Sequence, residues 1–392
     1  MNSQISQNHS QDKSHSMWKL AFEQFLKHRM AVIGLITILV LCLTALSAKW
    51  ITKWTGLDPD RQNVSARYLQ PFEKAILSSD QREMSVEKWI QEHPAETSSL
   101  INEITSATLV SSTGEDCLYD LASKEPTDAL ALIEKLPEST AKTSFQKMLS
   151  SFERIHLFGT DELGRDVFIR LIYGARVSIG VGILVALASA LIGFFIGSFA
   201  GYYGGVIDTL LMRVTDSLLS LPLVPVLIVI AAVDLQKLPW LYDLIGGPNE
   251  SIFKMVIILC MFSWMTVALL VRGAILSLKE REFILAAKTL GAKDSTIILK
   301  HLFPNVMAPM LVSISLGVGE SILFEAALSF LGLGIMPPTP SWGNMLNNAQ
   351  EVIYKNIWLA VLPGVLILLT TMSFNFFGDG LQDAMDPKSR RR

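Results

Sequence analysis

The chain contains 392 residues, of which 50% are hydrophobic and only 18% are charged, and its mean hydropathy is +0.40. A soluble domain carries charge on about a quarter of its residues, so this composition favours a membrane protein. The net charge of −3 gives no basic footprint for a nucleic acid. The three cysteines, Cys42, Cys117 and Cys260, form no CxxC or Cys/His cluster that would indicate a disulfide framework or a structural zinc site.

Six apolar segments are long enough to cross about 30 Å of hydrocarbon as helices. They lie roughly at Met30–Ser47, Ser178–Ala200, Leu218–Val233, Ile252–Arg272, Val306–Leu331 and Ile357–Phe377. We expect the third segment to begin earlier, near Asp208, and to be kinked by Pro222 and Pro225. The sequence therefore predicts an all-α membrane protein with six transmembrane helices.

Lysine and arginine indicate the orientation of these spans, because cytoplasmic loops carry an excess of both. They gather in residues 1–29, in the loop after the fourth span and in the tail at 381–392, and these three regions share one side of a six-span protein. We therefore expect a multi-pass protein with both termini in the cytoplasm. The loops at 234–251 and 334–356 contain few basic residues and are expected outside.

One region disagrees with this orientation. Arg165, Arg170 and Arg176 precede the second span on its expected outer side. Neighbouring carboxylates offset them in part: Asp161, Glu162 and Asp166. Span parity outweighs this single loop.

Residues 51–155 form a polar insert between the first two spans. Helical spacing runs through residues 87–104, 126–135 and 140–152. The expected core positions are Trp89, Ile90, Leu100, Ile101 and Ile104. A segment of about a hundred residues suffices for a small domain, so we predict a mostly helical external domain that serves as a spacer or as a docking surface.

Three glycines recur every four residues in the second span, at Gly193, Gly197 and Gly201. Small residues at this spacing let the backbones of neighbouring helices approach closely in lipid. We expect this face to serve helix packing; a role in gating is the alternative.

Two carboxylates and one tryptophan stand at or near membrane depth. Because a buried charge is costly unless it is paired, neutralised or facing water, the functional interpretation places Glu325, and with it Glu320, on the translocation pathway or in an interhelix polar contact. The alternative is a protonated or helix-capping carboxylate near the end of the span, which we prefer for Glu320.

Trp342 lies in an outer loop, where we expect an interfacial anchor rather than a contact with another protein.

The segment at 280–305, between the fourth and fifth spans, predicts two short helices. Gly291 suits the left-handed position that ends the first helix, and Pro304 turns the chain back toward the membrane. Ala286 and Ala287 give the first helix a low-relief surface beside three apolar residues. Such a helix suits a groove of a soluble partner; the alternative is an amphipathic connector on the membrane surface.

This segment resembles the "EAA" loop of bacterial ABC importer permeases, since Ala286, Ala287, Gly291 and Pro304 match its pattern. Other stretches narrow the resemblance to the peptide-importer permeases of the oligopeptide and dipeptide C type. They are Phe158-Gly-Thr-Asp-Glu-Leu-Gly-Arg-Asp-Val167, Leu171-Ile-Tyr-Gly-Ala-Arg176, Met212-Arg213 with Asp216, Glu325-Ala-Ala-Leu-Ser-Phe-Leu-Gly-Leu-Gly334, Pro338-Thr-Pro-Ser-Trp-Gly343 and Gly378-Asp-Gly-Leu-Gln-Asp-Ala-Met-Asp-Pro387.

The resemblance implies a coupling helix that docks on an ATP-binding subunit, with Ala286, Ala287 and Gly291 in coupling. The position of Glu325 inside an apolar run makes it the candidate pathway residue. It also implies a homologous second permease, two ATP-binding subunits and an external solute-binding protein. Two features depart from the family. Leu285 replaces the leading glutamate of the loop, and the insert is larger than the family usually shows.

Catalytic chemistry is not expected in this chain. The sequence contains no GxxxxGK[ST] phosphate loop, no HExxH and no GxSxG motif. We therefore predict a permease subunit that is not an enzyme, with no catalytic or metal-binding residues and no cofactor of its own, while partner subunits bind ATP and Mg²⁺.

The predicted function is import of oligopeptides or dipeptides across the bacterial inner membrane by alternating access. One alternative keeps this architecture and moves another solute, such as a nickel chelate. The other is a secondary transporter without an ATPase. The predicted organisation is a cytoplasmic tail at 1–29, a first transmembrane helix at 30–50, an external insert at 51–155, a five-helix permease core at 156–380 with a coupling loop at 278–305, and a cytoplasmic tail at 381–392.

Overall fold

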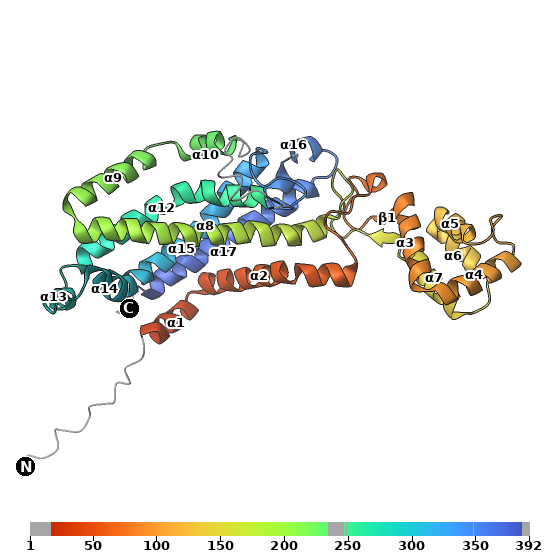
Figure 1. Cartoon of the computed structure of the whole chain (residues 1–392), viewed down its shortest axis with the longest axis horizontal. Coiled ribbons are helices and arrows are strands. Elements are labelled where there is room, and N and C mark those ends of the chain that lie inside the picture. The colour runs from red at the N-terminus through yellow and green to blue at the C-terminus, as the bar shows by residue number, and fades with distance from the viewer. Residues whose placement is uncertain (1–16, 234–246, 248, 348, 386–392) are drawn as a thin grey trace, which may run out of the picture. The chain divides into compact units, whose positions relative to one another are not determined.

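The computed structural model describes residues 17–233, 247, 249–347 and 349–385, and helices dominate it (Figure 1). Among these residues, five helical segments are long and apolar enough to cross a membrane. They comprise α2 (Arg29–Thr55), α8 (Val167–Tyr203), α12 (Glu250–Leu278), α15 (Phe303–Phe330) with the short elements before it, and α17 (Trp358–Met385). Helices satisfy their backbone polar groups internally, as hydrocarbon requires. The predicted all-α membrane fold is confirmed.

The third predicted span is a bent pair of helices. It consists of α9 (Gly205–Leu219) and α10 (Leu223–Ala231), which meet at 85°. Pro222 has no backbone N–H and disfavours helical geometry in the residue before it, so the helix breaks there rather than kinking. Pro225 lies in the first turn of α10, where its missing N–H costs nothing. Counted as one span, the pair brings the described spans to six.

Shorter elements complete the described chain. They are α1 (Met17–Lys27), a 3-10 turn (Val64–Ala66), α13 (Glu282–Thr289), α14 (Asp294–Thr296), a π-helical turn (Ile297–Leu302), a second 3-10 turn (Asn344–Leu346) and α16 (Ala349–Val352). Two compact units share the chain: a transmembrane unit of residues 1–49, 171–349 and 360–392, and an insert unit of residues 50–170 and 350–359.

Glycines mark the helix crossings of the transmembrane unit. A Cβ added at Gly197 of α8 would lie 2.5 Å from the carbonyl oxygen of Ala268 in α12, and one at Gly193 would lie 2.7 Å from Val267 Cβ. Gly201 meets the next turn of α12 in the same way. No larger residue fits these positions without moving α12, so the predicted packing face is observed.

The insert unit contains five helices and a two-stranded ribbon. The helices are α3 (Ser79–Glu92), α4 (Pro94–Ser106), α5 (Asp116–Ser123), α6 (Pro126–Glu134) and α7 (Thr140–Ser150). The strands β1 (Lys74–Ile76) and β2 (Glu153–Ile155) pair antiparallel, with Ala75 opposite Arg154. The expected helical stretch at 87–104 is divided, because Pro94 begins a new helix at a position that proline favours.

The helices of the insert unit enclose a hydrophobic core of their own. Trp89 packs edge-on against Phe145 with ring centroids 4.9 Å apart, and its indole N–H donates to the Ser144 hydroxyl. Of the expected core positions, Trp89, Leu100 and Ile104 are buried, whereas the remaining two are partly buried. The insert is therefore mostly helical, as predicted, and the two strands are an addition that the sequence did not indicate.

Cys117 reports on the integrity of this core. Its side chain is fully buried, and burial raises the pKa of the thiol, which suppresses the reactive thiolate. Phe145→Ala should destabilise the insert by about 3–5 kcal/mol. In a background with Cys42 and Cys260 replaced by serine, the rate of maleimide labelling of Cys117 should rise at least about tenfold. Met84→Ala, at an exposed position of α3, should leave the labelling rate unchanged, and equal rates in both variants would contradict this core.

Candidate functional site

The turn at Gly291 has the backbone geometry that its sequence predicts, whereas the second predicted helix does not end at Pro304, because Asp294–Phe330 form one helical segment. Gly291 adopts a φ of +76°, and its N–H donates to the Lys288 carbonyl at 2.9 Å. The N–H of Ala292 donates to the Ala287 carbonyl at 3.0 Å. This pair of bonds is the Schellman motif, in which glycine ends a helix in the left-handed conformation. Gly291 therefore sets the angle at which α13 leaves the loop.

The two alanines of α13 lie on different faces of the helix. Ala287 is buried with Ile284, in a cluster that includes Ile297 and Leu302 of the following segment, whereas Ala286 is exposed. Successive helix positions are about 100° apart, so adjacent residues cannot both face one partner squarely. Of the two alanines that were expected to form a small exposed surface together, only Ala286 is on the surface.

Large apolar side chains surround Ala286 on the exposed face. Phe283, Leu285 and Leu290 are 44%, 50% and 87% exposed. Leu285, which stands where the resembled family has an acidic residue, thus adds apolar surface to the loop instead of a charge. An exposed apolar face on a short connecting helix is the kind of surface that marks a protein interface.

Polar contacts fasten this loop to the neighbouring helices of the transmembrane unit. The hydroxyl of Tyr202, near the end of α8, donates to the Asp294 carboxylate at 2.6 Å, and the Lys288 ammonium lies 4.8 Å from the centre of the same ring. At the α9–α12 contact, the guanidinium of Arg272 donates to both carboxylate oxygens of Asp208, the second at 2.7 Å. Lys288 of α13 and Asp294 of α14 therefore both contact Tyr202 of α8.

Glu325 occupies a fully enclosed position in α15. Its carboxyl accepts hydrogen bonds from the hydroxyls of Ser178 in α8, at 3.0 Å, and Ser329 in α15, at 2.8 Å. The same hydroxyls accept backbone N–H groups of the loop after α15: Ser178 accepts from Trp342, and Ser329 accepts from Ile335. One carboxyl thus joins two helices and a loop.

Trp342 corrects the expectation of an interfacial anchor. Its side chain is fully buried, and its indole N–H donates to the Leu171 carbonyl at 3.0 Å. Gly174 makes room for the ring, since a Cβ there would lie 3.0 Å from Trp342 Cδ1. The neighbouring Gly343 likewise lies against α15, where a side chain would collide with the backbone of Ala326. The anchor interpretation is wrong because the partner of this tryptophan is protein, not lipid headgroups.

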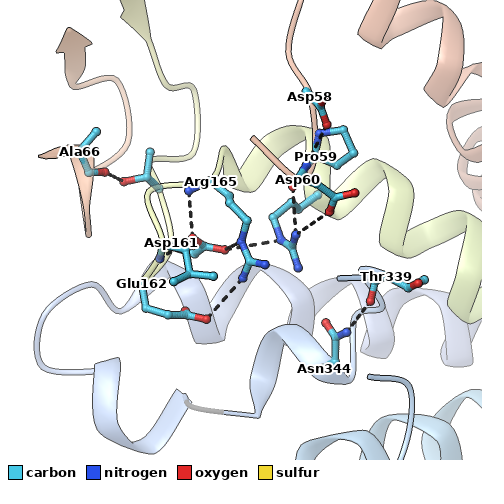
Figure 2. A network of polar contacts seen from close by, with 12 residues as sticks. Asp58, Pro59, Asp60, Ala66, Asp161, Glu162, Arg165, Thr339 and Asn344 are labelled. Atoms are coloured by element: carbon cyan, nitrogen blue, oxygen red, sulfur yellow. Dashed lines mark hydrogen bonds and ion pairs between the residues drawn. The ribbon is translucent and has the colours of Figure 1, made fainter. Parts of the chain in front are cut away.

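The arginines that opposed the predicted orientation lie mostly in a buried network of the insert unit (Figure 2). Arg165 reaches Asp161 at 2.7 Å and Glu162 at 3.4 Å, and the Asp161 carboxylate also accepts two backbone N–H groups. Arg170 donates to the Pro59 carbonyl at 3.0 Å and lies 3.5 Å from Asp161. Both arginines are paired in the structure, and of the three arginines only Arg176 is exposed.

These helices and this loop define an integral membrane transport subunit. The sequence matches the family described as binding-protein-dependent transport system inner membrane component over residues 193–391, and the chain belongs to this family. Residues 16–71 match the N-terminal transmembrane domain of oligopeptide transport permease C. Helices α3 to α7 fall between the two matched ranges.

Several relatives are named as permeases. The dipeptide transport system permease protein DppC of Bacillus subtilis is 42% identical over 256 residues, 65% of this chain and 76% of the relative. The oligopeptide permease OppC of the same organism is 40% identical over 236 residues, 60% of this chain and 73% of the relative. The glutathione permease GsiD of Shigella flexneri is 42% identical over 233 residues, which are 59% of this chain and 72% of the relative.

Removal of the buried carboxyl should weaken the helix contacts that it organises. Glu325→Ala leaves two buried hydroxyls without their acceptor, and we expect it to lower the free energy of unfolding by about 2–4 kcal/mol. The thermal unfolding midpoint of the detergent-solubilised protein should fall accordingly. Glu320→Ala, at an exposed position of the same helix, is the matched control. Equal midpoints for the two variants would refute the structural importance of the Glu325 contacts.

Proposed function

We propose that this chain is a permease subunit of an ATP-driven importer for short peptides. The observation that carries the proposal is the identity of about 40% to permeases named for dipeptides, oligopeptides and glutathione. All three solutes are short chains of amino acids with a free carboxylate. In this proposal the chain pairs with a homologous permease and receives its substrate from an external solute-binding protein.

ATP enters the cycle through partner subunits. The sequence has no phosphate loop of the GxxxxGK[ST] type, so two separate ATP-binding subunits hold ATP and Mg²⁺. The exposed face of Phe283, Ala286 and Leu290, which are three and four residues apart, docks on one of them. When the ATP-binding pair closes, α13 moves with it, and the Tyr202–Asp294 contact and the packing of Ile284 carry the motion into the spans.

The orientation follows from the charges of the loops. The basic segments, α13 among them, face the cytoplasm, as do both termini, and the insert at 51–155 lies outside the inner membrane of a bacterium. The two buried arginines of the insert unit do not count against this orientation, since their charges are paired. The boundaries of the tails, the insert and the permease core that the sequence predicts belong to this proposal as well.

Glu325 has two assignments in this proposal. In the described conformation it acts as an interhelix contact, enclosed by Ser178 and Ser329. The pathway role predicted from the sequence requires these hydrogen bonds to open in another state of the cycle. The contact role needs no such change, and we prefer it.

Isolation of the assembly tests the partners. When the tagged chain is extracted gently from its native membrane, a second permease and P-loop ATP-binding subunits should co-purify in stoichiometric amounts. The co-purifying or genetically adjacent solute-binding protein should retain a peptide, which separates peptide import from import of a nickel chelate. Recovery of the tagged chain alone, in a state active in transport, would refute the ABC assembly.

Gly291 tests the coupling loop. Gly291→Val places a β-branched side chain at positive φ, which should tilt α13 and reduce peptide uptake at least about tenfold while the assembly still forms. Gly291→Asn should retain most activity, because asparagine tolerates the left-handed region. Gly114→Val is the matched control, since Gly114 has a φ of +70° in equally open space within the insert unit. Normal uptake by Gly291→Val would eliminate the coupling role.

A further inference from the structure

A groove opens beside the first turns of α8 in the transmembrane unit. It encloses a volume of about 360 Å³, within the range of roughly 300–1,000 Å³ that is usual for sites of small ligands. From α8 it is lined by Tyr173, Arg176, Val177, Gly180, Val181 and Leu184. These positions recur at three- and four-residue steps and therefore share one face of the helix.

The lining of the groove is mostly apolar. Val177, Val181 and Leu184 provide apolar surface from α8, and Gly180 leaves space, since an added Cβ there would meet nothing within 4 Å. Asn249, the residue before α12, and Ile252 of α12 line the groove as well. Thr339 borders the groove from the loop after α15.

The position of Thr339 is fixed by its own loop. Its carbonyl accepts a hydrogen bond from the side-chain amide of Asn344 at 2.6 Å (Figure 2). The neighbouring Trp342 is buried against α8. The border of the groove thus belongs to the same loop that the contacts around Glu325 hold.

Arg176 is the one cation among the described lining residues, and none of them is acidic. Its side chain is exposed, and no described residue forms a hydrogen bond or an ion pair with it. Arg165 and Arg170, in contrast, are buried with carboxylate partners. Glu250, the first residue of α12, is the nearest acidic residue in the chain to Asn249, and it does not line the groove. A planar guanidinium that no described residue pairs is suited to bind a carboxylate through two parallel hydrogen bonds.

We propose that this groove binds the carboxyl-terminal end of the transported peptide, with Arg176 on the terminal carboxylate and a side chain of the peptide against Val181 and Leu184. The inference rests on the proposed peptide import and adds the group of the substrate that is recognised. Arg176 precedes the apolar run of α8, so the peptide meets it at the end of the span rather than at mid-membrane. The chemistry is shared by all peptides with a free carboxylate and is independent of their sequence.

Trialanine and trialanine amide are the probes. The complete assembly is reconstituted in proteoliposomes, and its solute-binding protein is loaded with each peptide beforehand, so that the measured preference belongs to the permease. The wild-type assembly should transport the free acid at least about tenfold faster than the amide, a typical effect of a charge-assisted hydrogen bond. Arg176→Gln should remove this preference by slowing the free acid alone, and Arg176→Lys should retain part of it. Arg67→Gln, at an exposed arginine of the insert unit, should leave the preference intact.

A second measurement does not involve the binding protein. In an otherwise cysteine-free chain, Thr339→Cys should react with a maleimide, and trialanine should slow this labelling whereas trialanine amide should not. Equal slowing of both peptides by Arg176→Gln would show a structural role and overturn the proposal. Dependence of the Arg176→Gln defect on anionic lipid rather than on the peptide carboxylate would overturn it as well. Absence of any peptide uptake by the wild-type assembly would instead refute peptide import, whereas protection of Thr339→Cys by trialanine would still support the groove.

Discussion

Close approach of helix backbones is the constraint on which the transmembrane unit depends. Apolar side chains gain little by leaving lipid for a protein interior that is equally apolar, so helices associate where small residues let them pack tightly. Gly197 lies against the Ala268 carbonyl of α12, and Gly34 of α2 lies against the Ser373 carbonyl of α17. Gly319 and Gly378 bring α15 and α17 together in the same manner. Each contact fixes the spacing of two spans, and the polar side chains then find partners at defined distances.

One polar contact lies where this packing fully buries it. Glu325 is enclosed, yet its carboxyl has hydroxyl donors from α8 and from its own helix. Because the same hydroxyls accept N–H groups from the loop after α15, the loop is held at a fixed position over the helices. This loop borders the groove at Arg176, so a contact buried for reasons of packing also shapes a candidate site of substrate recognition. At the other end of α8, Tyr202 contacts Lys288 of α13 and Asp294 of α14.

The spans and the coupling turn were predictable from the sequence because each rests on a local signal. Long apolar runs identify membrane helices, and a glycine after an apolar helix predicts the left-handed turn observed at Gly291. The ends of the spans were harder to predict from the sequence. The apolar run indicated a second span at residues 178–200, whereas α8 begins at Val167. Asp166 accepts the N–H of Ile169 and so caps a helix whose first turns include Arg170 and Arg176.

Long-range contacts explain the remaining differences. Nothing adjacent in the sequence indicates that Trp342 is buried against Leu171, although the glycines at 174 and 343 are the trace of its close packing. The sequence does not distinguish the two adjacent alanines of α13, but tertiary packing buries Ala287 and leaves Ala286 exposed. The hydrogen bond between Ser178 and Glu325 likewise joins positions 147 residues apart. The apolar sequence around Glu325 indicated that its carboxyl needs hydrogen-bond partners, but only the fold identifies them.

Uptake of radiolabelled trialanine into proteoliposomes tests the central claim most directly. The vesicles contain this chain, its co-purified subunits and the solute-binding protein, with ATP supplied on the side of α13. We predict uptake that requires hydrolysable ATP, stops when the ATP-binding subunits are removed and continues when ionophores abolish every ion gradient. Uptake driven by a proton or sodium gradient without ATP would contradict the account and identify a secondary transporter.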